Sequence, residues 1–167
     1  MSTDIRTFRA LVVDDDPNAI EYISYLLRRE VPGLEITCRS TADVSGDFEI
    51  YLLDNDFAGT RVASRLTENI RLRNPNALVL AFSASLDLAT LKGLLNAGCD
   101  AVADKSEPAD QVLLIDIIQR YISAATLEHA RVSQRRSTLS SVVDLLREWN
   151  KRYEYASIQQ RTHAHRR

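Results

Sequence analysis

Residues 9–13, Arg-Ala-Leu-Val-Val, run directly into Asp14, Asp15, Asp16 and Pro17. The short apolar run is typical of a buried β-strand. An acceptor side chain at Asp16 and a proline in the first helical position predict that a helix begins immediately after the acidic residues. A strand that passes through a short turn into a helix is the first part of a βαβ unit. This stretch therefore predicts an α/β domain with a buried sheet.

The alternation of strand and helix continues along the chain. Four further segments predict strands, at residues 34–38, 49–53, 77–82 and 101–103. Apolar spacing, together with flanking Pro, Gly and capping residues, predicts helices at residues 17–30, 58–73, 85–97 and from a Ser106 cap through Pro108 onward. Only about ten residues, 39–48, join the second and third strands, which leaves room for a helix of one or two turns or an irregular segment.

The order of these elements predicts the architecture of the sheet. Strands that alternate with helices form right-handed βαβ units and a parallel sheet. Five strands fit a flavodoxin-like sheet of order 2-1-3-4-5 with helices on both faces. The unbroken apolar run at residues 77–82 is expected for a strand that is covered on both sides. Ligands of such sheets bind beyond the carboxyl ends of the strands, which is where candidate site residues should lie.

Polar side chains stand at four of these strand ends. Asp14 and Asp15 follow the first strand, Asp54 the third, Ser83 the fourth and Lys105 the fifth. Three carboxylates that meet at one edge repel one another unless a cation lies between them, and oxygen ligands suit Mg²⁺. A lysine and a hydroxyl beside them could hold the oxygens of a phosphoryl group, because phosphoryl transfer depends mainly on alignment and charge neutralisation.

Four motifs together resemble the receiver domain of two-component response regulators, over about residues 8 to 122. They are Val12-Val13-Asp14-Asp15-Asp16-Pro17, Leu52-Leu53-Asp54, Phe82-Ser83-Ala84 and Ala103-Asp104-Lys105. The resemblance implies that Asp54 is the phosphoacceptor and that the phosphoryl donor is a sensor histidine kinase or a phosphotransfer protein. It implies a signalling domain rather than an enzyme in the ordinary sense, with only self-catalysed phosphotransfer and autodephosphorylation.

The same resemblance assigns a role to each remaining site residue. Asp15 and Asp54 would bind Mg²⁺ directly, together with the backbone carbonyl of Asp56, and Asp14 would act mainly through water. Ser83 and Lys105 would bind the phosphoryl oxygens. The side chain of Asp56, two residues after the phosphoacceptor, could lie near the path of a hydrolytic water.

Three positions depart from the family pattern. Ala58 stands where a proline is usual, Val102 where the family has a switch aromatic, and Ser106 where a proline usually follows the lysine. These departures leave open a pseudo-receiver, which would bind a partner without being phosphorylated. A phosphatase that uses the same groups on another fold is a third alternative, and Asp56 is its only candidate general acid.

The charge of the chain predicts a boundary near residue 122. Residues 1–122 contain 12 Lys and Arg against 19 Asp and Glu, a net charge of −7, whereas residues 123–167 contain 9 against 4, a net +5. The sequence thus predicts a receiver domain at 1–122 and a basic helical extension at 123–167, since no Gly or Pro occurs after Pro108. A heptad-like 3-4 spacing in the extension joins Leu139, Val142, Leu146, Trp149, Tyr153 and Ala156.

We expect this seam to form a homodimer or to dock on a downstream protein, with packing on its own receiver as the alternative. DNA binding is not expected, because forty-five residues are few for a helix-turn-helix output domain. No apolar run approaches the roughly eighteen residues of a membrane span, and the first residues do not form a secretory signal. Cys38 and Cys99 have no metal-ligand spacing and are expected to be free thiols. We therefore expect a cytoplasmic protein.

Overall fold

The computed structural model of the 167-residue chain describes residues 7–84 and 86–132. Its elements, in chain order, are β1 (Phe8–Val13), α1 (Pro17–Glu30), β2 (Leu34–Arg39), β3 (Ile50–Leu53), β4 (Asp56–Phe57), β5 (Thr60–Arg61), α2 (Ala63–Arg73), β6 (Leu78–Ser83), α3 (Leu88–Asn96) and β7 (Ala101–Asp104). A further helix occupies residues 108–132. The chain divides into two compact units, Met1–Ser123 and Ala124–Arg167, of which the first contains the sheet.

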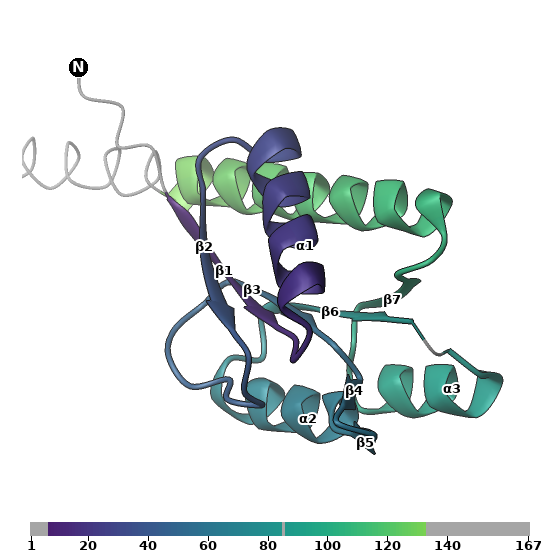
Figure 1. Cartoon of the computed structure of the whole chain (residues 1–167). Helices are drawn as coiled ribbons and strands as arrows, with labels where there is room; N and C mark the ends of the chain where they lie inside the picture. The colour runs from purple at the N-terminus through teal and green to yellow at the C-terminus, as the bar shows by residue number, and fades with distance from the viewer. Residues whose placement is uncertain (1–6, 85, 133–167) are drawn as a thin grey trace, which may run out of the picture. The chain divides into compact units, whose positions relative to one another are not determined.

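Five strands form one parallel sheet in the order β2-β1-β3-β6-β7. This is the flavodoxin-like order 2-1-3-4-5, so the predicted topology is confirmed. Figure 1 shows α1 and the helix that begins at residue 108 on one face of the sheet, and α2 and α3 on the other. Helices therefore cover both faces, as the sequence predicts.

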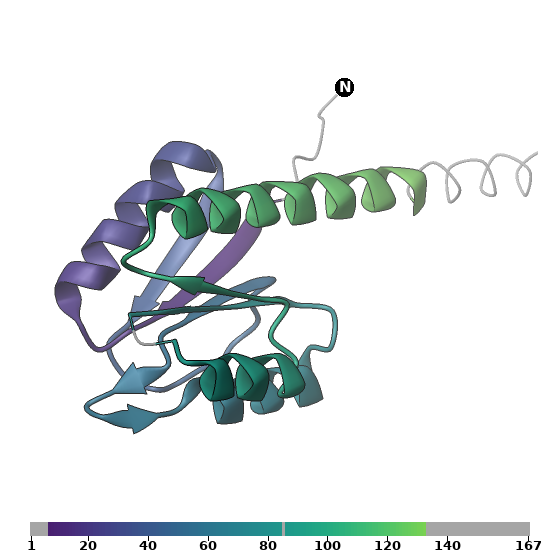
Figure 2. The same ribbon diagram turned by 90° about the vertical axis from the view of Figure 1, so that its right-hand side faces the viewer.

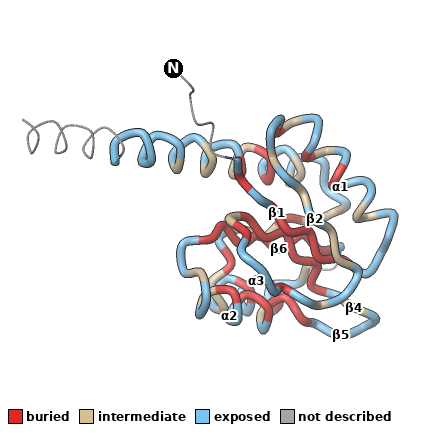
Figure 3. The backbone as a smooth tube through the Cα atoms, turned by 90° about the vertical axis from the view of Figure 1, so that its left-hand side faces the viewer, coloured by how far each residue is buried: buried red, intermediate tan, exposed pale blue. Residues whose placement is uncertain are grey.

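The central strands are buried because alternate side chains enter two separate cores. In β1, Leu11 and Val13 pack with residues of α2 and α3, whereas Ala10 and Val12 pack with α1 and the helix after residue 108. All six residues of β6 are buried, which explains its continuous apolar run. Figure 3 shows this burial along β1 and β6. Burying a valine or leucine side chain stabilises the fold by about 1.5–3 kcal/mol.

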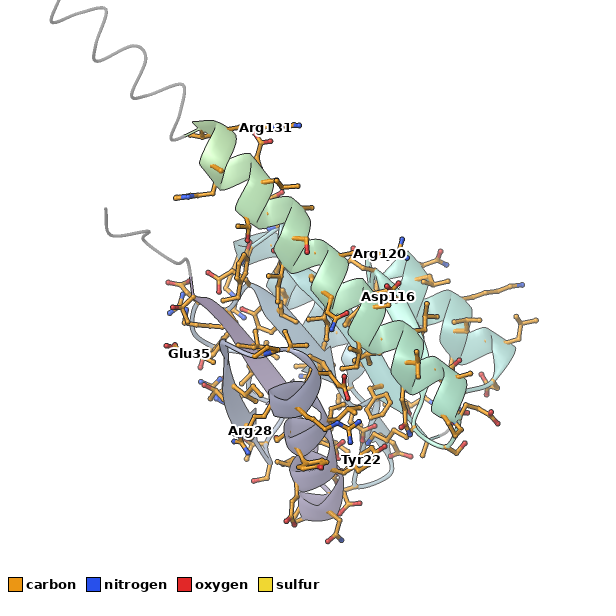
Figure 4. All side chains as sticks on the ribbon, turned by 90° about the horizontal axis from the view of Figure 1, so that it is seen from above. Tyr22, Arg28, Glu35, Asp116, Arg120 and Arg131 are labelled. Atoms are coloured by element: carbon orange, nitrogen blue, oxygen red, sulfur yellow. The ribbon has the colours of Figure 1, made fainter. Side chains whose placement is uncertain are left out.

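The first helix starts and stops where the sequence predicts. The Asp16 side chain accepts a hydrogen bond from the backbone N–H of Asn18, and Pro17 occupies the first turn. Gly33 follows the helix with a φ of +86°, a conformation that glycine adopts without strain. Tyr22, on the exposed side of α1, donates a hydrogen bond from Oη to Oε1 of Gln111 at 2.5 Å. Figure 4 shows α1 with Tyr22 beside the helix that begins at residue 108, on which Asp116 and Arg120 form an ion pair.

Residues 40–49, between β2 and β3, contain no helix, in agreement with the prediction that the segment is short or irregular. Val44 and Phe48 are buried there and belong to the core on the α2 side of the sheet. The Arg39 guanidinium donates hydrogen bonds to the carbonyl oxygens of Asp43 and Ser45. Val44 and Phe48 thus pack on the sheet where a further helix would otherwise lie, and Arg39 holds the segment by its hydrogen bonds.

The helix predicted at residues 58–73 begins only at Ala63, so its first five residues were wrongly assigned. Asp56–Phe57 and Thr60–Arg61 instead pair as an antiparallel hairpin, β4–β5. Its two-residue loop has positive φ at both positions, +48° at Ala58 and +79° at Gly59, as in a type I′ turn. Glycine suits the second loop position, but Ala58 stands at the first, where Asn, Asp or Gly usually marks such a turn.

Two helix starts differ slightly from the prediction. The helix predicted at residues 85–97 begins at Leu88, and the side chain of its N-cap, Asp87, accepts a hydrogen bond from the backbone N–H of Thr90. Ser106 does not cap the last helix. It donates from its backbone N–H and its hydroxyl to Oδ1 of Asp104, and the helix begins two residues later.

The predicted seam from Leu139 to Ala156 lies outside the described residues, as does most of the predicted extension at 123–167. Within residues 7–84 and 86–132, every helix is too short or too polar to span a lipid bilayer.

Candidate functional site

The carboxyl ends of β1 and β3 lie next to each other in the sheet. Val13 and Leu53 are partners in the parallel register, and the backbone N–H of Asp54 donates to the carbonyl of Val13 at 2.8 Å. The backbone N–H of Asp14 donates to the carbonyl of Arg39 at 3.1 Å, at the end of β2. Sheet pairing therefore continues one residue past the strands and fixes where the two aspartates leave the sheet.

Asp14, Asp15 and Asp54 form an acidic cluster at this edge, on the side where the β4–β5 hairpin also lies (Figure 2). Each of the three carboxylates offers an oxygen atom, and these oxygens lie within 4.8 Å of one another. Asp14 and Asp54 are buried, with 3% and 6% of their surface exposed, whereas Asp15 is exposed. Hard oxygen donors, two of them in a poorly solvated position, fit a divalent cation such as Mg²⁺, which retains some of its water.

Lys105 brings a positive charge into the cluster from the turn after β7. Its Nζ lies 2.5 Å from Oδ2 of Asp14 and 3.1 Å from Oδ1 of Asp54. Burial raises the pKa of Asp54 and the Asp14 charge adds to this, while the Lys105 ammonium opposes the shift. One ammonium group thus partly neutralises two buried carboxylates, and the third carboxylate remains in contact with solvent.

The turn that carries Lys105 is held by several hydrogen bonds. The backbone N–H of Lys105 donates to the carbonyl of Ser83 at 3.1 Å, and the backbone N–H of Asp104 donates to Oδ2 of Asp110. The two hydrogen bonds from Ser106 to Asp104 close the turn and lower the pKa of that carboxyl group. The sequence does not predict a site role for Asp104, Ser106 or Asp110. Their hydrogen bonds to one another hold the turn around Lys105 and do not reach the acidic cluster.

Ser83 is the last residue of β6 and is completely buried. It pairs in register with Asp104, the residue before the lysine. The structure therefore brings Ser83 and Lys105 to neighbouring strand ends, as the sequence predicts. Asp14, Asp15 and Asp54 meet directly, and Asp56 lies two residues farther along, exposed on β4. Their functional roles remain predictions.

The β4–β5 hairpin approaches the acidic cluster through its tip. The backbone N–H of Ala58 donates to Oδ2 of Asp15 at 2.8 Å. The sequence does not predict this contact, because it joins residues 43 positions apart and depends on a hairpin whose residues from Ala58 onward were predicted to be helical. One oxygen of Asp15 is thereby engaged, and its other oxygen is left for a ligand.

The comparisons with known proteins identify the fold. No family model and no curated protein matches this chain. Among solved structures, the BeF₃-activated receiver domain of DrrB from Thermotoga maritima aligns with a TM-score of 0.62 and 18% identity, over 71% of this chain and 99% of that domain. A CheY-like receiver domain protein from Methanospirillum hungatei JF-1 aligns with a TM-score of 0.63 and 22% identity, over 74% of this chain and 99% of the other.

A third structure, response regulator TrrA from Thermotoga maritima in complex with Mg²⁺ and BeF, has a TM-score of 0.57 and 24% identity, over 69% of this chain and 99% of TrrA. At these identities the likeness establishes the fold. The receiver-like fold expected from the four motifs is thus confirmed, and the chemistry of the site rests on the geometry of its own residues.

Proposed function

We propose that this protein accepts a phosphoryl group on Asp54 from the phosphohistidine of a sensor kinase or phosphotransfer protein. The observation that carries the proposal is the contact of Lys105 Nζ with both Asp14 and Asp54, at an edge where three carboxylates lie together. A nucleophilic carboxylate, a counter-charge and a set of metal ligands are the groups that aspartyl phosphorylation needs. The protein would act as a cytoplasmic signalling domain without substrate turnover.

In this proposal the carboxylate of Asp54 attacks the phosphorus atom of the donor. A new O–P bond forms at Asp54, the N–P bond of the phosphohistidine breaks, and the electron pair of that bond stays on the imidazole nitrogen. Mg²⁺ held by Asp15, Asp54, the Asp56 carbonyl and, through water, Asp14 would neutralise charge between the carboxylate and the phosphoryl oxygens.

The remaining residues hold and orient the groups that react. Lys105 contacts the Asp54 carboxylate at 3.1 Å and so favours its ionised, nucleophilic form against the effect of burial. After transfer, its ammonium group is in position to pair with a phosphoryl oxygen, and the Ser83 hydroxyl would donate a hydrogen bond to another. The buried setting of Asp54 keeps bulk water from the acyl phosphate and so slows its hydrolysis.

The decisive experiment is treatment of the full chain with acetyl phosphate and MgCl₂, followed by intact-mass and peptide mass spectrometry. We expect one phosphoryl group on Asp54, none without Mg²⁺, and none in Asp54→Asn. Glu68→Gln, which removes an exposed carboxylate on α2, is the matched control and should be modified like the wild type. Failure of the wild type to be modified, or modification of Asp54→Asn at the same rate, would contradict the proposal.

The pseudo-receiver remains the second candidate, and one observation favours it. The Asp15 carboxylate already accepts a hydrogen bond from Ala58, and Asp14 already pairs with Lys105, so the cluster is partly satisfied by the chain itself. A domain of this kind would bind its partner whatever the state of Asp54. The same mass measurement separates the two candidates, because a pseudo-receiver would stay unmodified in the presence of Mg²⁺.

A further inference from the structure

The β4–β5 hairpin is tied at two points to neighbouring parts of the protein. At its tip, the Ala58 N–H donates to Asp15 in the acidic cluster. At the end of β5, Nη2 of Arg61 lies 3.2 Å from Oδ2 of Asp87, the N-cap of α3. Asp87 is itself held, since its Oδ1 accepts a hydrogen bond from the backbone N–H of Thr90 at 2.6 Å. The hairpin therefore connects the acidic cluster to the start of α3.

The hairpin needs such anchors because it is too short to be stable alone. Each strand has two residues, and isolated two-stranded hairpins are marginal in water. The base is closed by a hydrogen bond from the Val62 N–H to the Asn55 carbonyl at 2.9 Å, and Phe57 packs against the core. Arg61 supplies the outer attachment, and the hydrogen bonds from Thr90 and then the Arg61 guanidinium lower the pKa of Asp87 to about 2.

We propose that Arg61 is a positioning residue of the acidic site. By holding the hairpin against Asp87, it keeps the Ala58 N–H on one oxygen of Asp15, so that the other oxygen is set for a divalent cation. Arg61 is also the register partner of Asp56, whose backbone carbonyl is the predicted metal ligand from the hairpin. The Asp56 carbonyl thus belongs to the hairpin, and Asp15 lies against its tip, so a guanidinium that anchors the hairpin from outside the metal site would act on both groups.

The role of Arg61 depends on one part of the proposed function, namely that Mg²⁺ binds at the acidic cluster. Both partners of the Arg61–Asp87 pair are 58% exposed, so the pair is a weak constraint in water. Its loss should loosen the hairpin rather than release it, because Phe57 and the Val62–Asn55 hydrogen bond remain. We expect Arg61→Ala to weaken Mg²⁺ binding about two- to fivefold, at a tenfold change per ~1.4 kcal/mol.

The test is a titration of the full ¹⁵N-labelled chain with MgCl₂, followed by NMR, with no phosphoryl donor present. The readouts are the Mg²⁺ dissociation constant and the chemical shift and hydrogen-exchange rate of the Ala58 amide. In Arg61→Ala we expect weaker binding and faster exchange at Ala58, and in Arg61→Lys we expect partial recovery of both. Arg65→Ala removes another exposed positive charge, from α2, and should behave like the wild type.

A double-mutant cycle tests whether Arg61 acts through Asp87. Asp87→Asn keeps a side chain that can cap α3 but loses the charge, so it should weaken Mg²⁺ binding in the same direction without unfolding the helix. If the two residues act as one unit, the double variant binds no more weakly than Arg61→Ala. Thermal unfolding of each variant shows whether a change in binding is a general loss of stability.

The outcomes separate this proposal from the one on which it rests. A wild type that shows no shift with MgCl₂ overturns both. A wild type that binds, with Arg61→Ala binding equally well and with an unchanged Ala58 amide, leaves the metal site in place and overturns the role of Arg61. Equal weakening in Arg65→Ala also overturns it, because the effect would then be one of net charge. Weaker binding and faster Ala58 exchange in Arg61→Ala, with Arg65→Ala unchanged, support it.

Discussion

Nζ of Lys105 lies 3.1 Å from Oδ1 of Asp54, although the two residues leave different strands of the sheet and are 51 positions apart. Their side chains are 17% and 6% exposed, so water screens the pair only weakly. The same ammonium group contacts Asp14. Lys105 therefore supplies positive charge to the acidic cluster from within the chain. Its removal would leave the buried carboxylates of Asp14 and Asp54 close together without that charge.

Lys105→Met should destabilise the protein when divalent cations are removed, because it leaves buried charge uncompensated. We expect a loss of about 3 kcal/mol in the free energy of unfolding in EDTA. Part of this should return as MgCl₂ is added, since a cation that binds the folded state stabilises it. Urea denaturation in EDTA and in MgCl₂ measures both effects. Lys92→Met, at an exposed position of α3, is the control, and equal stability of all three proteins in EDTA would contradict the prediction.

Asp15→Ala should weaken Mg²⁺ binding more than Asp14→Ala. Asp15 is exposed and has one oxygen free of the Ala58 hydrogen bond, whereas Asp14 is buried against Lys105. We expect a loss of roughly tenfold or more for Asp15→Ala, which corresponds to ~1.4 kcal/mol, and a smaller loss for Asp14→Ala. Calorimetric titration with MgCl₂ measures the two affinities. Asp47→Ala, a remote exposed acid, controls for net charge, and unaltered binding in both site variants would rule out these ligands.

Ala58→Asn should stabilise the hairpin. Ala58 has a φ of +48°, which costs an L-residue with a Cβ roughly 1 kcal/mol, and asparagine tolerates this region better than alanine. We expect a gain of about 0.5–1 kcal/mol in the free energy of unfolding. Gly59→Ala should have the opposite effect, because its φ is +79° even though nothing lies within 4 Å of an added Cβ. Urea denaturation distinguishes them, and a gain in Gly59→Ala would show that the turn differs from type I′.

The hairpin also shows where prediction from the sequence ends. The five strands and their order could be predicted, because most sheet strands are short apolar runs and the alternation with helices fixes parallel pairing. The meeting of Asp14, Asp54 and Lys105 followed from that order. The hairpin could not be predicted, because strands of two residues are too short to show a periodic pattern. Residues 58–62 were therefore predicted as part of the next helix. The Arg61–Asp87 pair depends on that hairpin and on an N-cap at Asp87, a residue that the prediction placed inside a helix at 85–97.

Asp56→Asn should change the lifetime of the phosphorylated form without changing the fold. Asp56 is exposed on β4, two residues after Asp54, and its carboxylate can repel a phosphoryl dianion or orient a hydrolytic water. Loss of this charge alters the approach of water, and we expect a change of severalfold in the dephosphorylation rate. The rate is measured by mass spectrometry after removal of acetyl phosphate. Asp47→Asn is the control, and an equal lifetime in all three proteins would leave Asp56 without a role in hydrolysis.

The basic extension is predicted to govern assembly, and this prediction rests on the sequence because residues 137–167 lie outside the described residues. The 3-4 spacing of Leu146, Trp149 and Tyr153 places them on one face if the segment is helical. Burial of such side chains stabilises by roughly 1.5–3 kcal/mol each, so a face of this kind requires a partner surface. Removal of residues 137–167 should convert a dimer to a monomer and leave phosphorylation of Asp54 intact.

A pair of point variants separates the seam from the charge of the extension. Leu146→Asp places a carboxylate in the seam and should abolish the dimer, whereas Arg147→Asp changes the charge at the next residue, off the seam, and should largely preserve it. Analytical ultracentrifugation of the full chain, the truncation and both variants measures the oligomeric state, with and without phosphorylation. A monomeric full-length protein at tens of micromolar in both states would refute self-association. Docking of the seam on its own receiver or on another protein would then account for its apolar face.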